Sequence, residues 1–198
     1  ATSSSITNNS TPTITGNAEA DSTITLFNGD VEIGIATTNS EGVFTITPST
    51  SLEDGTYSLT TKSTDSAGNI SSQSASISIT IDTSIPDAPA SLATTSSDTN
   101  DTTPTITGTA EADSTITLLN GSVVIGTATT DSEGAFSITP STALLDGDYS
   151  LEAKATDAAG NISPESSPIL ITIDTTAPNA PTSLVDISDT NDTTPTIT

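Results

Sequence analysis

The chain of 198 residues contains no cysteine, histidine, methionine or tryptophan, and its only basic residues are Lys62 and Lys154. The absence of cysteine excludes disulfides and thiolate metal sites, and the absence of histidine excludes a Ser-His-Asp triad. With 25 acidic residues the formal net charge is −23. Nucleic acids and anionic membranes are bound by clustered Lys and Arg, so both partners are excluded, and a hard cation is the expected small ligand.

Long apolar runs and aromatic residues are also scarce. No run is long enough to span a membrane, and Ala1 does not begin a signal peptide, so we expect the export signal of a secreted parent protein to lie elsewhere. Few aromatics and a high net charge are also typical of flexible stalks rich in Ser and Thr. Internal repetition argues against that interpretation.

The sequence contains two copies of one unit and the start of a third. Motifs recur at an offset of 92 residues: TPTITG at 11–16 and 103–108, AEADSTITL at 18–26 and 110–118, AGNIS at 67–71 and 159–163, and ITIDT at 79–83 and 171–175. Solenoid repeats have periods of about 20 to 50 residues, so this period predicts an array of small domains instead. We place repeat one at 1–83, a proline-containing linker at 84–88, repeat two at 89–175, and a linker with the truncated third repeat at 176–198.

Each unit is predicted to form about seven short strands. Apolar and Ser/Thr residues alternate in the second copy at 103–108, 114–119, 123–130, 135–139, 149–156 and 168–173, with a short strand near 90–93. Asn120-Gly121 is a hairpin-turn signal, and Pro140 ends a strand. One apolar face and one Ser/Thr face are typical of a half-solvated sheet. The fold class is therefore all-β, with two tandem immunoglobulin-like antiparallel β-sandwich domains in an elongated rod.

A tyrosine follows the same Asp-Gly turn in both copies. Tyr57 and Tyr149 stand at the start of the sixth strand, where immunoglobulin-like folds carry a tyrosine corner. We predict that each hydroxyl donates to the backbone of the preceding turn, although a simple core position would explain the same residues.

The combination of TPTITGxAEADSTITL, DGxYSL, TDxAGNIS and ITIDTxxPxAP resembles the bacterial immunoglobulin-like repeats of giant surface adhesins, of the biofilm-associated and RTX types. The resemblance covers both full units and the start of the third. It implies an extracellular, calcium-stiffened extender that projects a distal adhesive domain from the bacterial cell surface. No glycine-rich RTX nonapeptide is present in the sequence, so adhesion itself is expected to lie outside this segment.

Acidic loops of repeat two are predicted to gather where repeat one ends. Up-and-down strands place the loops after the second, fourth and sixth strands at the end of the sandwich that faces the preceding repeat, which we call the leading end. Calcium takes about six to eight oxygen ligands, and it relieves the repulsion between carboxylates that lack Lys or Arg partners. The expected ligands at this junction are Asp82, Asp87, Glu111, Asp113, Asp157 and Asn161.

Two other groups repeat parts of this pattern. The leading end of repeat one carries Glu19, Asp21, Asp65 and Asn69, and the far end of repeat two carries Asp98, Asp101 and Asp174. Repeat one has Ile6 and Asn9 in place of Asp98 and Asp101, which weakens the far-end prediction. Each of these residues could equally form a turn, because Asp accepts from backbone amides and Asn tolerates positive φ.

Several functions are compatible with a repeated sandwich. The leading hypothesis is that the chain is a structural spacer and not an enzyme. The partners expected for such a spacer are the neighbouring repeats of the same chain and calcium. A glycan-binding or cell-cell contact module would need exposed aromatics, whereas all five aromatics lie on alternating strands. Ice binding would need a flat face, and sandwich sheets twist. A filament made by exchange of a terminal strand stays open, because repeat one has almost no counterpart of 90–93 and the strand at 190–198 has no domain.

Overall fold

A computed structural model describes residues 4–182, whose regular secondary structure consists of β-strands only. Repeat one comprises β1 (Ser4–Thr7), β2 (Ile14–Asn17), β3 (Thr23–Asn28), β4 (Val31–Thr37), β5 (Val43–Ile46), β6 (Gly55–Thr64) and β7 (Ile77–Ile81). Repeat two comprises β8 (Ala90–Thr94), β9 (Asp98–Thr99), β10 (Ile106–Thr109), β11 (Thr115–Asn120), β12 (Val123–Thr129), β13 (Ala135–Ile138), β14 (Gly147–Thr156) and β15 (Ile169–Ile173). The strand predicted at 190–198 lies outside the described residues.

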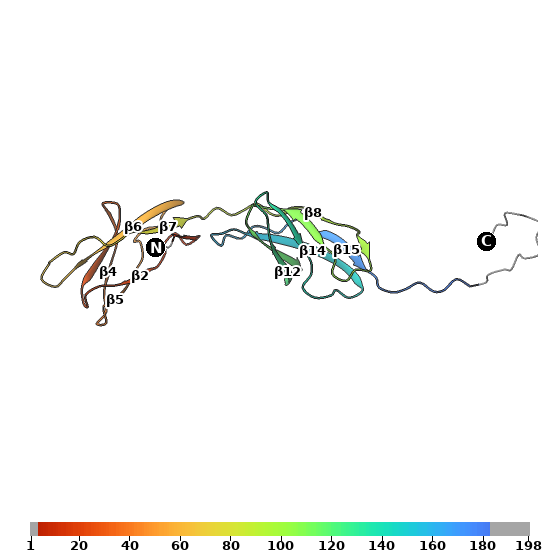
Figure 1. The fold of residues 1–198 in the computed structure, drawn as a ribbon, viewed down its shortest axis with the longest axis horizontal. Coiled ribbons are helices and arrows are strands. Elements are labelled where there is room, and N and C mark those ends of the chain that lie inside the picture. The colour runs from red at the N-terminus through yellow and green to blue at the C-terminus, as the bar shows by residue number, and fades with distance from the viewer. Residues whose placement is uncertain (1–3, 183–198) are drawn as a thin grey trace, which may run out of the picture.

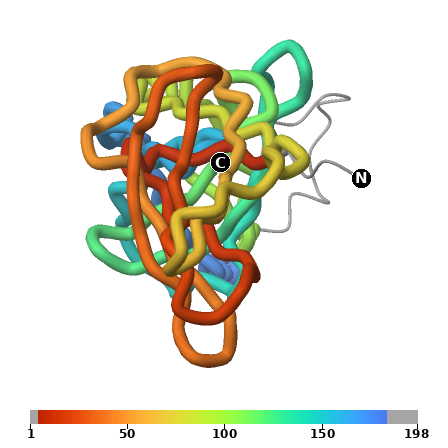
Figure 2. The backbone as a smooth tube through the Cα atoms, turned by 90° about the vertical axis from the view of Figure 1, so that its left-hand side faces the viewer, coloured from red at the N-terminus to blue at the C-terminus, as the bar shows by residue number. Residues whose placement is uncertain are grey.

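The two repeats follow one another along the long axis of the molecule (Figure 1). Seen along that axis, they overlie each other (Figure 2). Across residues 4–182, no helix has the length and apolar character needed to cross a membrane. The prediction of an all-β chain with tandem immunoglobulin-like sandwiches is confirmed.

Each repeat divides its strands between two sheets. Repeat two has the orders β12-β11-β14-β15-β9 and β13-β10-β8, and repeat one has β4-β3-β6-β7-β1 and β5-β2. All these pairs are antiparallel except β1 with β7 and β9 with β15, which are parallel. The strand β9 is an eighth strand that the sequence analysis did not predict, because two residues are too few to show alternation.

Each sandwich has its own apolar core. In repeat two the side chains of Ile116, Leu118 and Leu151 are fully buried, and Leu26 and Leu59 take the corresponding places in repeat one. Thr115, which precedes Ile116 on β11, is exposed. The period of two therefore positions one apolar face inward along each strand, as the sequence predicted.

The predicted hairpin and tyrosine corners are present. Gly121 has a φ of 57° between β11 and β12, a conformation that glycine adopts without steric cost. The hydroxyl of Tyr149 donates to the carbonyl of Leu145 at 3.0 Å, and Tyr57 donates to Glu53 at 2.9 Å. Both bonds join the start of β6 or β14 to the turn before it, which confirms the predicted tyrosine corner.

None of the five aromatic side chains is fully exposed. Phe44 and Phe136 are buried, and Phe27, Tyr57 and Tyr149 are half-buried. The Lys62 Nζ atom lies 5.6 Å from the centroid of the Phe27 ring, which shields one face of that ring. These positions agree with the predicted core role rather than with an aromatic platform for glycans.

Candidate functional site at the junction between the repeats

Hydrogen bonds join repeat one directly to the loop between β14 and β15 of repeat two. The side-chain amide of Asn161 donates to the backbone carbonyl of Asp82 at 2.8 Å. The backbone amide of Asn8 donates to the carbonyl of Ala159 at 3.1 Å. Asp82 itself follows β7, and its amide donates to Thr7 at 3.0 Å, so the acceptor is fixed to the body of repeat one.

The loop that carries Asn161 is held by Asp157. One carboxylate oxygen of Asp157 accepts from the backbone amides of Gly160 and Asn161, and the other accepts from the Asn161 side chain at 2.7 Å. Partial burial opposes ionisation of Asp157, but the bonds from Asn161 and Gly160 outweigh it and hold its pKa below the usual value. The Asn161 side chain is thereby oriented before it meets Asp82.

The equivalent loop of repeat one, which has no preceding repeat among the described residues, shows how much the contact at Asn161 buries. Asp65 accepts from Asn69 as Asp157 does from Asn161, so the local structure is the same. Asn69 is nevertheless exposed, whereas Asn161 has only 7% of its surface accessible. The difference arises because Asn161 packs against the repeat that precedes it.

The linker between the repeats is partly buried. Pro86 and Pro89 are buried, whereas Pro178 and Pro181 at the corresponding places after repeat two are exposed. Asp87 and Glu111 line a common hollow of about 400 Å³ between the linker and the loop after β10. Two prolines with fixed φ, packed against their surroundings, restrict bending at this point.

An aspartate clamp at the far end of each repeat was missed by the sequence analysis. One oxygen of Asp146 accepts from the amide and the hydroxyl of Thr175, and the other accepts from the Thr176 hydroxyl at 3.1 Å. Asp54 binds Thr83 and Ser84 in the same way. The sequence analysis treated Asp146-Gly147 as a turn only. The clamp fixes the direction in which the chain leaves each sandwich.

Replacing Asp146 by Asn should destabilise repeat two more at neutral pH than in acid. The bonds from Thr175 and Thr176 exceed the opposing effect of burial and lower the pKa of Asp146 below its ordinary 3.8. A carboxylate with a depressed folded-state pKa stabilises the fold above its unfolded pKa, and this contribution is lost as the pH falls through the folded-state value. Urea unfolding at about pH 7 and about pH 3 measures the difference between wild type and variant.

Asp54→Asn should give the same pH dependence in repeat one. Asp30→Asn, at an exposed turn position, is the control and should leave both stabilities unchanged. A difference between wild type and Asp146→Asn that stays constant from neutral to acid pH would contradict the role of the charged clamp.

The predicted calcium ligands lie in loops, except Asp98 at the start of β9, and they are not gathered into carboxylate clusters. Within residues 4–182, no group of three or more Asp or Glu side chains is close enough to hold a metal ion. Only Asn161, which Asp157 holds in place, contacts Asp82, by donating to its carbonyl. Asp87 and Glu111 line the same hollow. The Asp82 carbonyl and the Asp157 carboxylate converge on the Asn161 amide, and both are hard oxygen donors of the kind that calcium binds. The donor chemistry fits a junction ion in part, and calcium binding stays a prediction.

The other members of the three groups have structural partners. Asp21 and Asp113 have positive φ. The carbonyls of Glu19 and Glu111 each accept from two buried hydroxyls, those of Ser22 and Thr38 in repeat one and of Ser114 and Thr130 in repeat two. The two Glu and two Asp residues thus form the tight turn after the second long strand of each sandwich.

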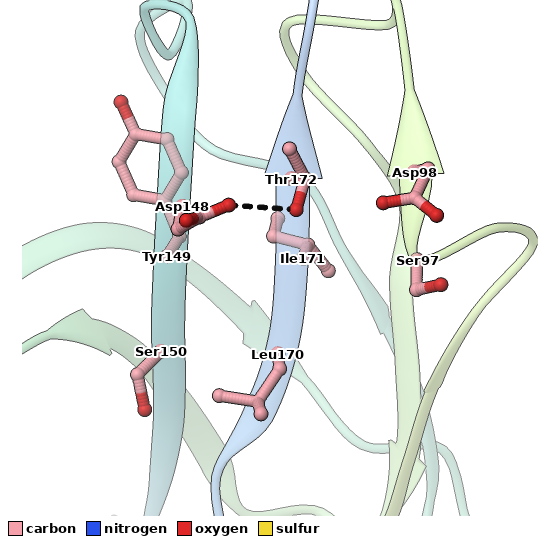
Figure 3. A pocket seen from close by; sticks show the side chains of 8 residues that line it. All are labelled: Ser97, Asp98, Asp148, Tyr149, Ser150, Leu170, Ile171 and Thr172. Atoms are coloured by element: carbon pink, nitrogen blue, oxygen red, sulfur yellow. Dashed lines mark hydrogen bonds between the residues drawn. The ribbon is translucent and has the colours of Figure 1, made fainter.

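At the far end of repeat two the predicted ligands form turns or a strand edge. Asp101 accepts from the amide of Thr103, and Asp174 accepts from the amide of Thr176. Asp98 begins β9, where it lines a shallow hollow across β14, β15 and β9 (Figure 3). Asp148, on the same surface, accepts from the Thr172 hydroxyl at 2.8 Å. In the structure, Asp101 and Asp174 therefore form turns, as the alternative prediction proposed.

Comparison with known proteins places the repeats in a known class. A family model described as a bacterial Ig-like domain matches residues 1–83 and 89–175. Solved structures that are similar include the BSP domain of a biofilm-associated protein (25% identity, TM-score 0.37, 87% of this chain and 29% of that one) and a tetra-tandem repeat from the extending region of a large adhesion protein (24%, 0.38, 85% and 46%). The ligand-binding domain of human OSCAR is also similar (17%, 0.37, 84% and 93%). The chain spans less than half the length of the first two structures, and no curated protein matched it.

Proposed function

Because the chain belongs to the bacterial Ig-like domain family, we propose that it is a spacer segment of an extracellular bacterial adhesin. In this proposal, tandem repeats stiffened by calcium project a distal adhesive domain from the cell surface, and the segment has no enzymatic activity of its own. The observation that carries the proposal is the hydrogen bond from Asn161 of one repeat to Asp82 of the other.

A spacer must resist bending at each junction, and direct contact between repeats provides that resistance. A linker alone lets neighbouring domains reorient, because interdomain motion is the default where few contacts cross the boundary. Here Asn161 and Ala159 are buried against repeat one, and two buried prolines restrict the linker. Each contact uses residues that recur at an offset of 92, so every further repeat would form the same junction.

Calcium would add to this contact if it bound at the leading end of repeat two. Asp82, Asp157 and Asn161 would hold it, with Asp87 and Glu111 as further oxygen donors nearby. A bound ion would neutralise part of the −23 charge and would link the two repeats through ligands from both. The neighbouring repeats of the same chain and calcium are thus the proposed partners.

Removing the Asn161 side chain should make the rod flexible. Small-angle X-ray scattering of the Asn161→Ala variant should show a shorter average maximum dimension and a broader distribution of shapes than the wild type. Asn69→Ala is the matched control, because it loses the same bond to an Asp within its loop but has no contact with another repeat among the described residues. Identical scattering curves for Asn161→Ala and Asn69→Ala would contradict the proposed stiffening by this contact.

A further inference from the structure

The first and last strands of repeat one lie side by side and end at the junction. β1 and β7 are parallel, with Thr7 opposite Ile81. The backbone amide of Asp82 extends this pairing by one further bond, to the carbonyl of Thr7 at 3.0 Å. β7 ends on the side of repeat one that faces repeat two (Figure 1). The chain therefore enters this pair of strands through β1 and leaves it through β7.

Tension along the chain would load this pair in shear. The N-terminal side would pull β1 away from repeat two, and the linker would pull β7 toward it, so the two strands are drawn in opposite directions along their common axis. The hydrogen bonds of a parallel ladder are evenly spaced along the strands, so such a pull loads all of them together and not one after another. The pair of β1 and β7 is therefore the part of repeat one that bears tension.

One loop of repeat two binds the ends of both strands. The backbone amide of Asn8, the residue after β1, donates to the carbonyl of Ala159 at 3.1 Å. The carbonyl of Asp82, the residue after β7, accepts from the side-chain amide of Asn161 at 2.8 Å. Ala159 and Asn161 are two residues apart in a loop that Asp157 holds together. The loop therefore bridges β1 and β7 from outside their own repeat.

The burial of this loop shows that the bridge is closely packed at both strands. Ala159 is 9% exposed, whereas its counterpart in repeat one, Ala67, is exposed. A Cβ added at Gly160 would lie 3.7 Å from the side-chain nitrogen of Asn8, which is an ordinary contact distance. The loop thus packs against the chain after β1 as well as against the chain after β7.

We propose that this loop locks β1 to β7, so that repeat two strengthens repeat one against tension. Sliding of the two strands past each other has to break the bonds at Asn8 and Asp82 as well as the bonds between the strands. The loop also transmits tension from repeat two to the chain after β1, and not only through the linker to β7. The role under tension rests on the proposed spacer function, whereas the lock itself rests on the contacts alone.

The same groups recur at the far end of repeat two. Asn100 and Asp174 follow β9 and β15 as Asn8 and Asp82 follow β1 and β7. The amide of Asp174 donates to the carbonyl of Thr99 at 3.0 Å, which is the length of the equivalent bond in repeat one. A following repeat with the same loop would find the same two groups to bind. The lock therefore has a direction, in which each repeat strengthens the repeat before it.

Hydrogen exchange of the full chain tests the lock. Asn161→Ala, a substitution in repeat two, should speed exchange of the Asn8 and Asp82 amides of repeat one by about tenfold, because the hydrogen bonds between them and the loop are lost. The Asp174 amide makes the equivalent bond in repeat two and should be unchanged. Asp146→Asn is the matched control, since it weakens repeat two at its far end and leaves the loop in place.

Single-molecule force spectroscopy tests the role under tension. The chain contains no cysteine, so Ser5→Cys and Ile85→Cys, both at exposed positions, provide two unique points at which to pull. Force then acts across β1 and β7, and repeat two stays outside the loaded path. Asn161→Ala should nevertheless raise the unfolding rate of repeat one at constant force by about tenfold, and Asp146→Asn should leave that rate unchanged.

Either of two results would overturn the proposal. One is exchange at Asn8 and Asp82 that is the same in Asn161→Ala and in the wild type. The other is an unfolding rate of repeat one under force that Asn161→Ala leaves unchanged or that Asp146→Asn raises equally. The scattering of Asn161→Ala reports on bending and not on the strands of repeat one, so failure of the lock and failure of the spacer proposal can be told apart.

Discussion

Replacing Phe136 by Ala should destabilise repeat two by about 3 to 5 kcal/mol. Phe136 is 5% exposed, and its ring lies so close to Gly108 that a Cβ there would come within 2.6 Å of it. Truncation would remove the ring and leave a cavity that the backbone of Gly108 cannot fill. Repeat one has a separate core, so its stability should change little.

Hydrogen exchange of backbone amides measures the two repeats separately. Phe136→Ala should raise exchange throughout β10 to β15 and leave β3 and β6 protected. Phe44→Ala, at the same position in repeat one, should do the reverse. Equal loss of protection in both repeats after either substitution would mean that the sandwiches do not have independent cores.

We expect calcium at about 10 mM to raise the free energy of unfolding of the wild-type chain by about 1.4 to 2.7 kcal/mol, taking an affinity in the range known for extracellular calcium modules. A ligand that binds only the folded state must shift unfolding in this way. The physical reason here is the net charge of −23, which only two basic residues offset. Thermal unfolding with calcium or with a chelator measures the shift.

Two controls separate a specific ion from general screening of charge. Magnesium at the same concentration should stabilise less, because it requires a compact octahedral site. Asp157→Asn should reduce the calcium effect, since Asp157 is a proposed ligand at the junction. A melting temperature that is identical with calcium and with chelator would eliminate the ion from the proposal, while the direct contact through Asn161 would remain.

The fold could be predicted from the sequence because its signals are local. The alternation in Thr115–Leu119 and the Asn120-Gly121 turn specify a hairpin without knowledge of the rest of the chain. The corner at Tyr149 follows from its distance to the preceding turn. The short strand β9 was missed because its pairing with β15 spans more than seventy residues and involves only two pairs.

The site was only partly predictable because it depends on which partner each carboxylate finds. That the loop of Asp157 and Asn161 would face the end of repeat one follows from strand direction, and the bond from Asn161 to Asp82 agrees with it. Whether Asp101 or Asp174 faces an ion or its own turn cannot be read from residue type, since both use the same oxygen atoms. The clamp of Asp146 on Thr175 joins residues 29 apart, and no local pattern indicates it.

Residual dipolar couplings of the wild-type chain, measured in weakly aligned solution with calcium, test the central claim most directly. If the contact between Asp82 and Asn161 makes the two repeats one rigid body, the couplings of amides in both repeats will fit a single alignment tensor. Two tensors of clearly different magnitude would show that the repeats tumble separately, which would contradict a rigid junction.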